Sequence, residues 1–169
     1  PVTYYVATDG SDDNDGSENS PFATIQAGID AASDGDLVLV QAGTYVENIN
    51  YNGKNIVVQG ENRETTIIDG GGSGSVVKLN SGENSSSIFS NFTIINGSAG
   101  SGGGLYIENS NPIITNLDIT NNNGISSGGG IFIQYSSSVL TDINIISNTS
   151  AKGAGICSDN SQAIFENIN

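Results

Sequence analysis

Carboxylates crowd a short segment near the N-terminus, and they are the first side chains whose chemistry has to be considered. They are Asp9, Asp12, Asp13, Asp15 and Glu18. Hard cations such as Ca²⁺ bind several oxygen ligands from a flexible loop. The spacing does not fit an EF-hand, because a loop aligned on Gly16 has Phe22 where a glutamate is required. Two interpretations stay open: a solvated turn, or a structural calcium site formed by Asp9, Asp12, Asp13 and Asp15.

Groups for acid–base or nucleophilic catalysis are sparse. Inverting glycoside hydrolysis uses two carboxyl groups roughly 6.5–9.5 Å apart. Asp118 and Asp142 are candidates, because they fall in neighbouring sequence repeats, but uncharged residues align with both of them in the other repeats. The chain has no histidine and only four basic residues, which are Lys54, Arg63, Lys78 and Lys152. We assign no catalytic residue on this basis.

Two aromatic side chains are candidates for ligand binding. Tyr106 and Phe132 stand at equivalent repeat positions, with Lys78 one repeat before them and Cys157 one repeat after them. If their aliphatic neighbours point inward, this column points outward and the two rings stack on adjacent rungs. Exposed aromatic rings bind sugar faces or other proteins. The alternative is that a loop or a lateral neighbour covers the rings.

The elements that position these side chains follow from an internal repeat. Gly102–Ile107 is echoed by Gly128–Ile133 and Gly153–Ser158, a period of about 25 residues. Short runs of β-branched residues alternate with Gly, Asn and Ser inside each repeat, and no repeat has room for a helix. Such a unit is one coil of a solenoid whose parallel strands stack about 4.8 Å apart. The sequence predicts an all-β, right-handed, single-stranded parallel β-helix of roughly five coils.

Aligned columns indicate which side chains fill the core. Four inward columns are predicted: Val77, Leu105, Ile131 and Ile156; Leu79, Ile107, Ile133 and Ser158; Ile88, Ile113, Val139 and Ile164; and Phe92, Leu117, Ile143 and Ile168. A polar column holds Asn91, Asn116, Asp142 and Asn167. We expect these four to form an amide ladder in which each side chain bonds to the next rung. Asp142 fits this ladder less well, because an ionised carboxylate cannot donate a hydrogen bond.

The first 36 residues follow a different pattern. Residues 2–6 read as a strand, and apolar residues recur at helical spacing from Phe22 to Ala32. Ser20 is the expected N-cap and Pro21 the first helical residue. We expect this helix to cover the open end of the stack, as terminal caps of repeat proteins do. The predicted organisation is therefore a strand and capping helix over 1–36 and continuous coils over 37–169, open or truncated at the C-terminus.

Several segments resemble the pectin-lyase-like superfamily, especially its secreted bacterial β-helix repeat proteins. They are Tyr5–Gly16, Ser20–Gln26, Gly35–Val40, Gly43–Tyr45, Thr66–Gly70 and the Gly-Gly-Gly-Leu-Tyr-Ile repeats. The resemblance implies the parallel β-helix for the whole chain, but the fold carries lyases, hydrolases, epimerases and adhesins alike. Lyases of the superfamily use a Lys or Arg base, often with Ca²⁺, and only Lys78 lies at an outward strand position here. The pectin-hydrolase branch uses several Asp residues and usually a His.

The composition of the chain limits the classes of partner that it is expected to bind. The formal net charge of −14 disfavours nucleic acid and anionic membranes as partners, and no membrane-inserting run is found. The single Cys157 excludes an intrachain disulfide, and we expect it to fill one rung. The favoured function is a non-catalytic extracellular or cell-surface module, such as an adhesin, sheath or filament component, with polysaccharide or end-to-end self-association as partners. The alternatives are a polysaccharide lyase or glycoside hydrolase fragment, or a carbohydrate-binding module; Ca²⁺ is the one cofactor considered.

Overall fold

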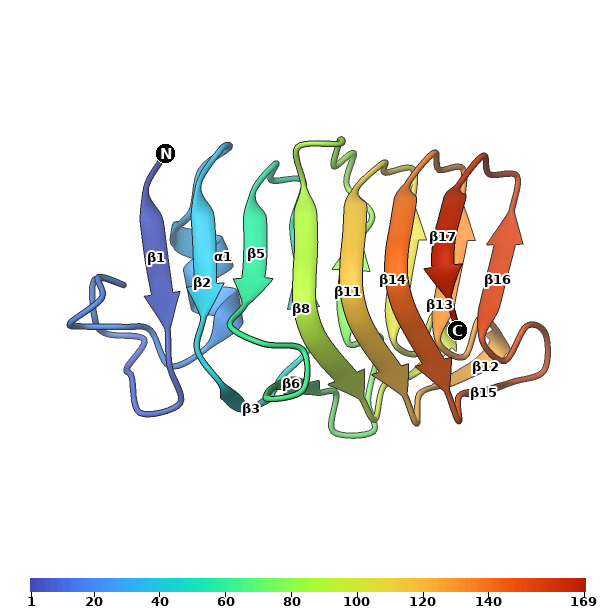
Figure 1. The fold of residues 1–169 in the computed structure, drawn as a ribbon, viewed down its shortest axis with the longest axis horizontal. Coiled ribbons are helices and arrows are strands. Elements are labelled where there is room, and N and C mark those ends of the chain that lie inside the picture. The colour runs from blue at the N-terminus through green and yellow to red at the C-terminus, as the bar shows by residue number, and fades with distance from the viewer.

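The computed structural model describes all 169 residues, and they form a parallel β-solenoid of about five turns with one short helix (Figure 1). The elements follow one another as β1 (Thr3–Val6), α1 (Ile25–Ala31), β2 (Leu37–Val40), β3 (Gly43–Val46), β4 (Ile49–Asn50), β5 (Val57–Gly60), β6 (Thr66–Asp69), β7 (Val77–Leu79), β8 (Ile88–Ile95), β9 (Ser98–Ser101), β10 (Leu105–Glu108), β11 (Ile113–Thr120), β12 (Asn123–Ser127), β13 (Ile131–Gln134), β14 (Val139–Ile146), β15 (Thr149–Ser150), β16 (Ile156–Asp159) and β17 (Ile164–Ile168). No helix has the length and apolarity needed to cross a membrane.

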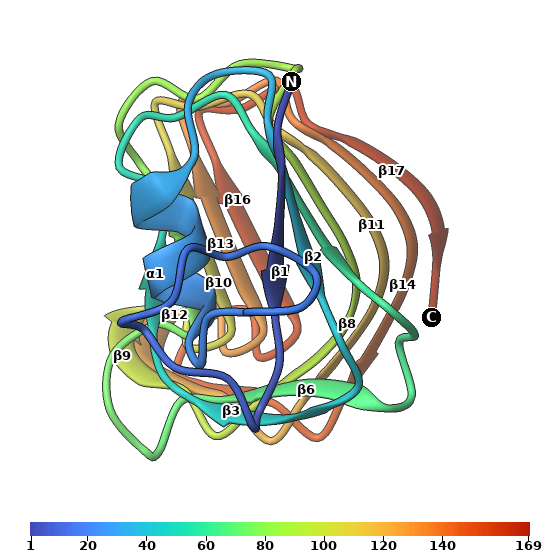
Figure 2. The ribbon, with the colours of Figure 1, turned by 90° about the vertical axis from the view of Figure 1, so that its left-hand side faces the viewer.

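Three parallel sheets run along the solenoid. The nine-stranded sheet follows the order β1-β2-β5-β8-β11-β14-β17, with β3 and β6 beside it. A five-stranded sheet joins β4, β7, β10, β13 and β16, and a three-stranded sheet joins β9, β12 and β15. Figure 2 looks along the long axis of the solenoid from its N-terminal end and shows the strands of each sheet arranged one behind another. The three coils from β8 to β16 each contribute one strand to each sheet, whereas in the two coils before them β3 and β6 belong to the nine-stranded sheet. The outer faces of these sheets are the surfaces on which a site can be built.

The core consists of stacked aliphatic and aromatic side chains from the nine-stranded and five-stranded sheets, their connections and α1, and it holds 28 buried residues. The strand registers confirm the alignment of the predicted columns that begin at Val77, Leu79 and Phe92. The exception to their inward orientation is Ser158, which lies in the last coil and is exposed. Inside the stack, Phe89 and Phe92 lie face to face with ring centroids 4.6 Å apart. Offset stacking of this kind adds about 0.5–1.5 kcal/mol to the contribution of area burial.

One predicted inward column is wrong. Ile88, Ile113 and Val139 point outward and are partly exposed, whereas their neighbours Phe89 and Ile114 are fully buried. The cause is a single residue with a left-handed backbone, Asn91 in β8, and its equivalents in the later coils. This bend interrupts the alternation of the strand, so that Phe89 and Phe92 both face inward although they are three positions apart. Counting back from Phe92 in steps of two therefore assigns Ile88 to the wrong face.

The N-terminal helix begins later than predicted. Thr24 is the N-cap, and its hydroxyl accepts a hydrogen bond from the Ala27 N–H, so that neither Ser20 nor Pro21 occupies its expected place. The helix packs its buried face on β1 and β2 beside β4, where it continues one wall of the first coil. The loop between β1 and α1, rather than the helix, runs across the near end in Figure 2, and Phe22 from this loop lies on Tyr4.

Candidate functional site

The aromatic column predicted from the repeats lies on the outer face of the five-stranded sheet. Register places Tyr106 between Lys78 and Phe132, and Phe132 next to Cys157. The rings of Tyr106 and Phe132 stack with centroids 5.4 Å apart and an interplanar angle of 18°. Stacking on adjacent rungs is thus confirmed.

Exposure of the column differs from the prediction. Phe132 is only 9% exposed and Cys157 only 7%, while Tyr106 and Lys78 are partly exposed. A ring as covered as Phe132 cannot serve as a sugar platform, so the expectation of two exposed aromatics is corrected to one, Tyr106. Phe132 instead supports the Tyr106 ring from the next rung.

A glycine turn precedes each of the last three strands of the column, at Gly102, Gly128 and Gly153. A Cβ atom added at Gly128 would lie 2.4 Å from the Ile131 carbonyl oxygen and 2.9 Å from the Phe132 Cα, and Gly128 has a φ of +62°. The equivalent Gly153 would bring a Cβ to 3.2 Å from that of Cys157. Glycine therefore lets each turn close directly on the strand it precedes. The same turn precedes Tyr106, where a Cβ atom added at Gly102 would lie 3.0 Å from the Tyr106 Cα, so the turn is common to all three rungs and does not by itself cover Phe132 and Cys157. Tyr106 differs from them because it is open on its Lys78 side.

That open side is a surface hollow of about 330 Å³. It is lined by Ser75, Lys78, Asn80, Ala99, Gly100, Ser101 and Tyr106. The Ser101 and Ser127 hydroxyl groups lie 2.9 Å apart at its rim. Burial, followed by contact with the Glu108 carboxylate, raises the pKa of Tyr106, so its hydroxyl remains protonated across the physiological range. The hollow thus offers hydroxyls, an amide, one ammonium group and a ring face.

Lys78 is distinctive because the other basic side chains have different surroundings. The Lys54 ammonium donates to three backbone carbonyls at the end of α1, and the Arg63 guanidinium pairs with Asp118. Lys152 lies exposed in the turn before β16. In an acidic chain, Lys78 is therefore the cation that faces a hollow. Sequence reasoning placed Lys78 outward but missed Ser75, Asn80 and Ser101, because they come from segments outside the aligned strand core.

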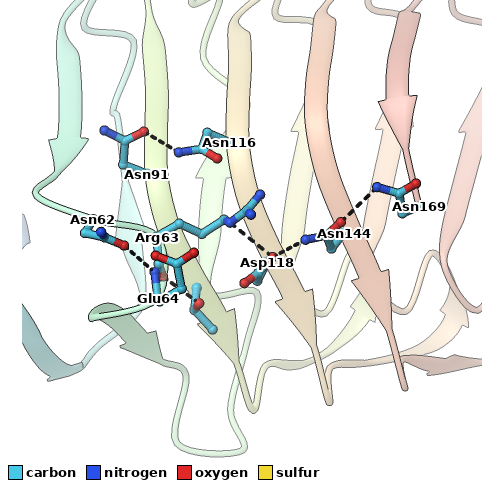
Figure 3. A network of polar contacts seen from close by, with 9 residues as sticks. Asn62, Arg63, Glu64, Asn91, Asn116, Asp118, Asn144 and Asn169 are labelled. Carbon is cyan, nitrogen blue, oxygen red and sulfur yellow. Dashed lines mark hydrogen bonds and ion pairs between the residues drawn. The ribbon is translucent and has the colours of Figure 1, made fainter.

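A second polar surface covers the outer face of the nine-stranded sheet (Figure 3). The Arg63 Nε lies 3.4 Å from Asp118 Oδ1, and the Asn144 amide donates to the same oxygen at 2.7 Å. Asn169 donates in turn to Asn144 at 3.1 Å, so one row crosses three strands. Register sets Asp118 beside Asn144 and not beside Asp142, so the two carboxylates do not face each other on paired rungs. Sequence reasoning missed the Arg63–Asp118 pair, because the two residues are far apart in the repeat alignment.

The predicted amide ladder forms as two separate pairs. The Asn116 amide donates to Asn91 at 2.8 Å, and the Asn167 amide donates to Asp142 at 3.0 Å. All four residues have a positive φ, between 51° and 66°, a region that Asn and Asp tolerate better than other non-glycine residues. In each pair the side-chain amide donates to the residue one coil nearer the N-terminus. The Asp142 carboxylate has no N–H group, so it cannot donate to Asn116 in the same way. The ladder is interrupted at the residue that was expected to fit it least well.

The N-terminal carboxylates do not converge. Both Asp12 oxygens are occupied, since they accept from the Ala23 and Thr24 N–H groups and from the Thr24 hydroxyl. Asp15 accepts from the N–H two residues ahead, which lowers its pKa. Nowhere in the chain do three or more His, Cys, Asp or Glu side chains form a group that could hold a metal ion. The geometry therefore gives no support to a calcium site at Asp9, Asp12, Asp13 and Asp15.

Solved structures with the same architecture are carbohydrate-active enzymes. The chain superposes on pectin methylesterase PemA from Erwinia chrysanthemi with a TM-score of 0.69 and 14% identity, covering 98% of this chain and 54% of that one. It also matches a GH136 lacto-N-biosidase from Eubacterium ramulus (TM-score 0.55, 15% identity, 99% and 40% covered) and pectate lyase Pel9A (TM-score 0.51, 20% identity, 100% and 55% covered). At these identities the likeness concerns the fold, and this chain spans about half the length of those proteins or less.

Comparison of sequences assigns the chain to a narrower group than comparison of folds does. An uncharacterized protein of Bacillus subtilis (strain 168), YwoF, is 32% identical over 72 residues, which is 34% of this chain and 15% of that protein. The model of one family matches residues 8–168, from the first acidic loop to the last strand. The chain therefore belongs to the family described as "Protein of unknown function (DUF1565)".

Proposed function

We propose that this chain is an extracellular, structural β-helix module that binds a saccharide in the hollow beside Tyr106. The observation that carries the proposal is the meeting of Lys78 and Tyr106 at one hollow. A sugar presents C–H faces that lie on an aromatic ring, and hydroxyl groups that hydrogen-bond with Ser, Asn and Lys side chains. Ser75, Asn80 and Ser101 supply those partners around the ring.

The stacked column prepares the ring for binding. Tyr106 is held from one side by Phe132 at 5.4 Å, and its backbone is fixed by parallel pairing on both edges of β10. A ligand would meet a ring already in place, so little side-chain entropy is lost on binding. Surface attachment by repeated coils, as in an adhesin or sheath component, is the setting in which we expect such a hollow to act.

Titration with oligosaccharides tests the proposal and separates the roles of the two residues. Neutral and uronate oligosaccharides are titrated by calorimetry into the wild-type chain and into Lys78→Ala and Tyr106→Ala. We expect Tyr106→Ala to weaken every ligand that binds. Lys78→Ala should weaken uronates selectively by about tenfold or more, since a charge-assisted hydrogen bond contributes about 1.5–3 kcal/mol.

Tyr135→Ala is the matched control, because Tyr135 is a tyrosine that is 54% exposed beyond the end of β13. Its affinity should equal that of the wild type. Absence of binding to either ligand class, or equal losses in Tyr106→Ala and Tyr135→Ala, would refute the proposal. Release of reducing ends or unsaturated products during the titration would replace the binding role with that of a hydrolase or lyase.

A further inference from the structure

An outward-facing aliphatic row runs along the nine-stranded sheet, and neither the ladder nor the hollow uses it. We call it the aliphatic row; it consists of Leu37, Val57, Ile88, Ile113, Val139 and Ile164. Register pairs each member with the next across six consecutive strands, from β2 to β17. All six are partly or fully exposed, while the residue that follows each of the first five, such as Val38 or Phe89, is fully buried. The row is therefore surface and not core.

The middle of the row is flanked on both sides by uncharged polar side chains. Ser90, Thr115 and Thr141 follow it by two positions on their strands, and Ser86, Asn111 and Ser137 precede it by two positions. Thr115 and Thr141 bond to each other at 2.8 Å, and the Ser137 N–H donates to Asn111. An apolar centre with an uncharged polar margin is the composition found at the centre of protein–protein interfaces, where charged residues are depleted.

The face that carries the aliphatic row differs from the rest of this acidic chain because few charged side chains lie on it. The chain carries −14, yet few of its carboxylates lie on these strands: Asp118 lies beyond the left-handed bend, and Asp142 forms that bend. Glu166 alone lies on the same side of the bend as the row, at its C-terminal end beside Ile164. A cationic partner would be drawn to the acidic surfaces elsewhere. Two copies of an acidic chain, in contrast, approach most closely where neither carries charge, and that place is the middle of the aliphatic row, at Ile88, Ile113 and Val139.

Repetition also makes the row complementary to itself. A twofold axis through Ile113 would set Ile113 against its own copy, Ile88 against Val139 and Val57 against Ile164. Aliphatic side chains would then meet aliphatic side chains at every rung except that of Leu37. Most soluble homo-oligomers are twofold dimers with such self-complementary surfaces. Two sheets would then face each other about 10 Å apart, as in a sandwich. We propose that two copies of this chain associate side by side through the aliphatic row, independently of the saccharide hollow.

The size of the row sets the expected strength. Six rungs about 4.8 Å apart span about 24 Å. A standard interface buries about 800 Å² per partner, and the whole chain exposes 6874 Å². A narrow strip therefore predicts a reversible dimer in the micromolar range rather than a permanent one. High salt should strengthen it, because screening weakens the repulsion between the two acidic bodies.

Sedimentation equilibrium over a concentration series, at low and at high salt, tests the proposal on the 169-residue chain. The wild type should approach the dimer mass with rising concentration, and do so sooner in high salt. Ile113→Asp should stay monomeric in both buffers. Because Ile113 points outward, its circular dichroism and melting temperature should stay close to those of the wild type.

Ile125→Asp provides the matched control, since Ile125 is 63% exposed on β12 of the three-stranded sheet. It introduces the same charge away from the row and should dimerise as the wild type does. A wild type that is monomeric throughout would overturn the proposal. So would an Ile125→Asp variant that dissociates as fully as Ile113→Asp, or a mass that grows beyond the dimer and is insensitive to Ile113→Asp, which is the result expected of end-to-end stacking.

Discussion

Removal of the Lys54 ammonium group should detach α1 from the first full coil. The Nζ atom donates to the carbonyl oxygens of Ile29, Asp30 and Ala32 at 2.8, 2.7 and 2.8 Å. These carbonyls lie at the C-terminal end of α1, and that end carries no basic residue of its own. A cation from another coil therefore neutralises the negative end of the helix dipole and satisfies carbonyls that would otherwise be left unpaired.

The magnitude follows from those contacts. Hydrogen bonds to a charged group contribute about 1.5–3 kcal/mol, and a cation at a helix C-terminus about 0.3–1 kcal/mol. Three bonds from one nitrogen are not additive, so we expect Lys54→Ala to lower the free energy of unfolding by about 2–3 kcal/mol. At about 2–4 °C per kcal/mol for a chain of this size, the melting temperature should fall by about 4–12 °C.

Urea unfolding monitored by circular dichroism measures the total loss, and hydrogen exchange at the amides of α1 shows whether the loss is local. Lys54→Met separates the two contributions of the side chain, because it keeps the aliphatic stem and removes only the charge. We expect the methionine variant to be nearly as unstable as the alanine variant. If Lys54→Met were as stable as the wild type, the stem and not the ammonium would hold the helix, and the electrostatic explanation would fail.

Three further outcomes are expected from the backbone and the ladder. Gly128→Ala should destabilise the chain by about 1–3 kcal/mol in urea, because of its positive φ and its close carbonyl, whereas Gly100→Ala, which has open space around it, should be nearly neutral. Hydrogen bonds from two backbone N–H groups lower the pKa of Asp36 in the folded chain. The ionised carboxylate therefore stabilises the fold above its ordinary pKa near 4, and this stabilisation is lost as the pH falls through the lowered pKa. Asp36→Asn should flatten the acid limb of a plot of melting temperature against pH. Asp142→Asn should raise stability by about 0.5–1.5 kcal/mol in urea, because an amide there can also donate to Asn116, and no gain would show that the interrupted ladder is of no consequence.

The strand registers could be predicted from the sequence because a solenoid repeats one geometry. Aligning Leu105, Ile131 and Ile156 by their glycine runs was enough to place them in one inward file, and pairing of β10, β13 and β16 in that register confirms it. Each coil packs only on its neighbours, so residues that align between successive repeats are also the residues that contact each other in the fold. The hydrophobic period therefore specified the core wherever the strand was regular.

The errors arose where the backbone departs from that regularity. Asn91 has a φ of 66°, and a single residue in this region reverses which face the following side chains occupy. Asn is a frequent residue at such positions, but it is also common in ordinary loops, so its conformation was not evident from the letter alone. The same limit applies to Phe132, whose burial does not follow from its place in the repeat, because Tyr106 at the equivalent position is partly exposed.

Sites on a solenoid are best sought at positions that depart from their own column. A residue type that recurs in every coil, such as the aliphatic residues of the aliphatic row, is accounted for by stacking on its neighbours. Such a column can contact only a partner surface that repeats in the same way. Lys78 stands in a column of aromatic and thiol side chains, and Asp118 stands between Thr93 and Asn144. Neither gains from stacking on a like neighbour, so each needs a partner of another kind. Asp118 pairs within the chain with Arg63, whereas Lys78 faces an open hollow, and this difference makes the hollow beside Tyr106 the first place at which to test for a ligand.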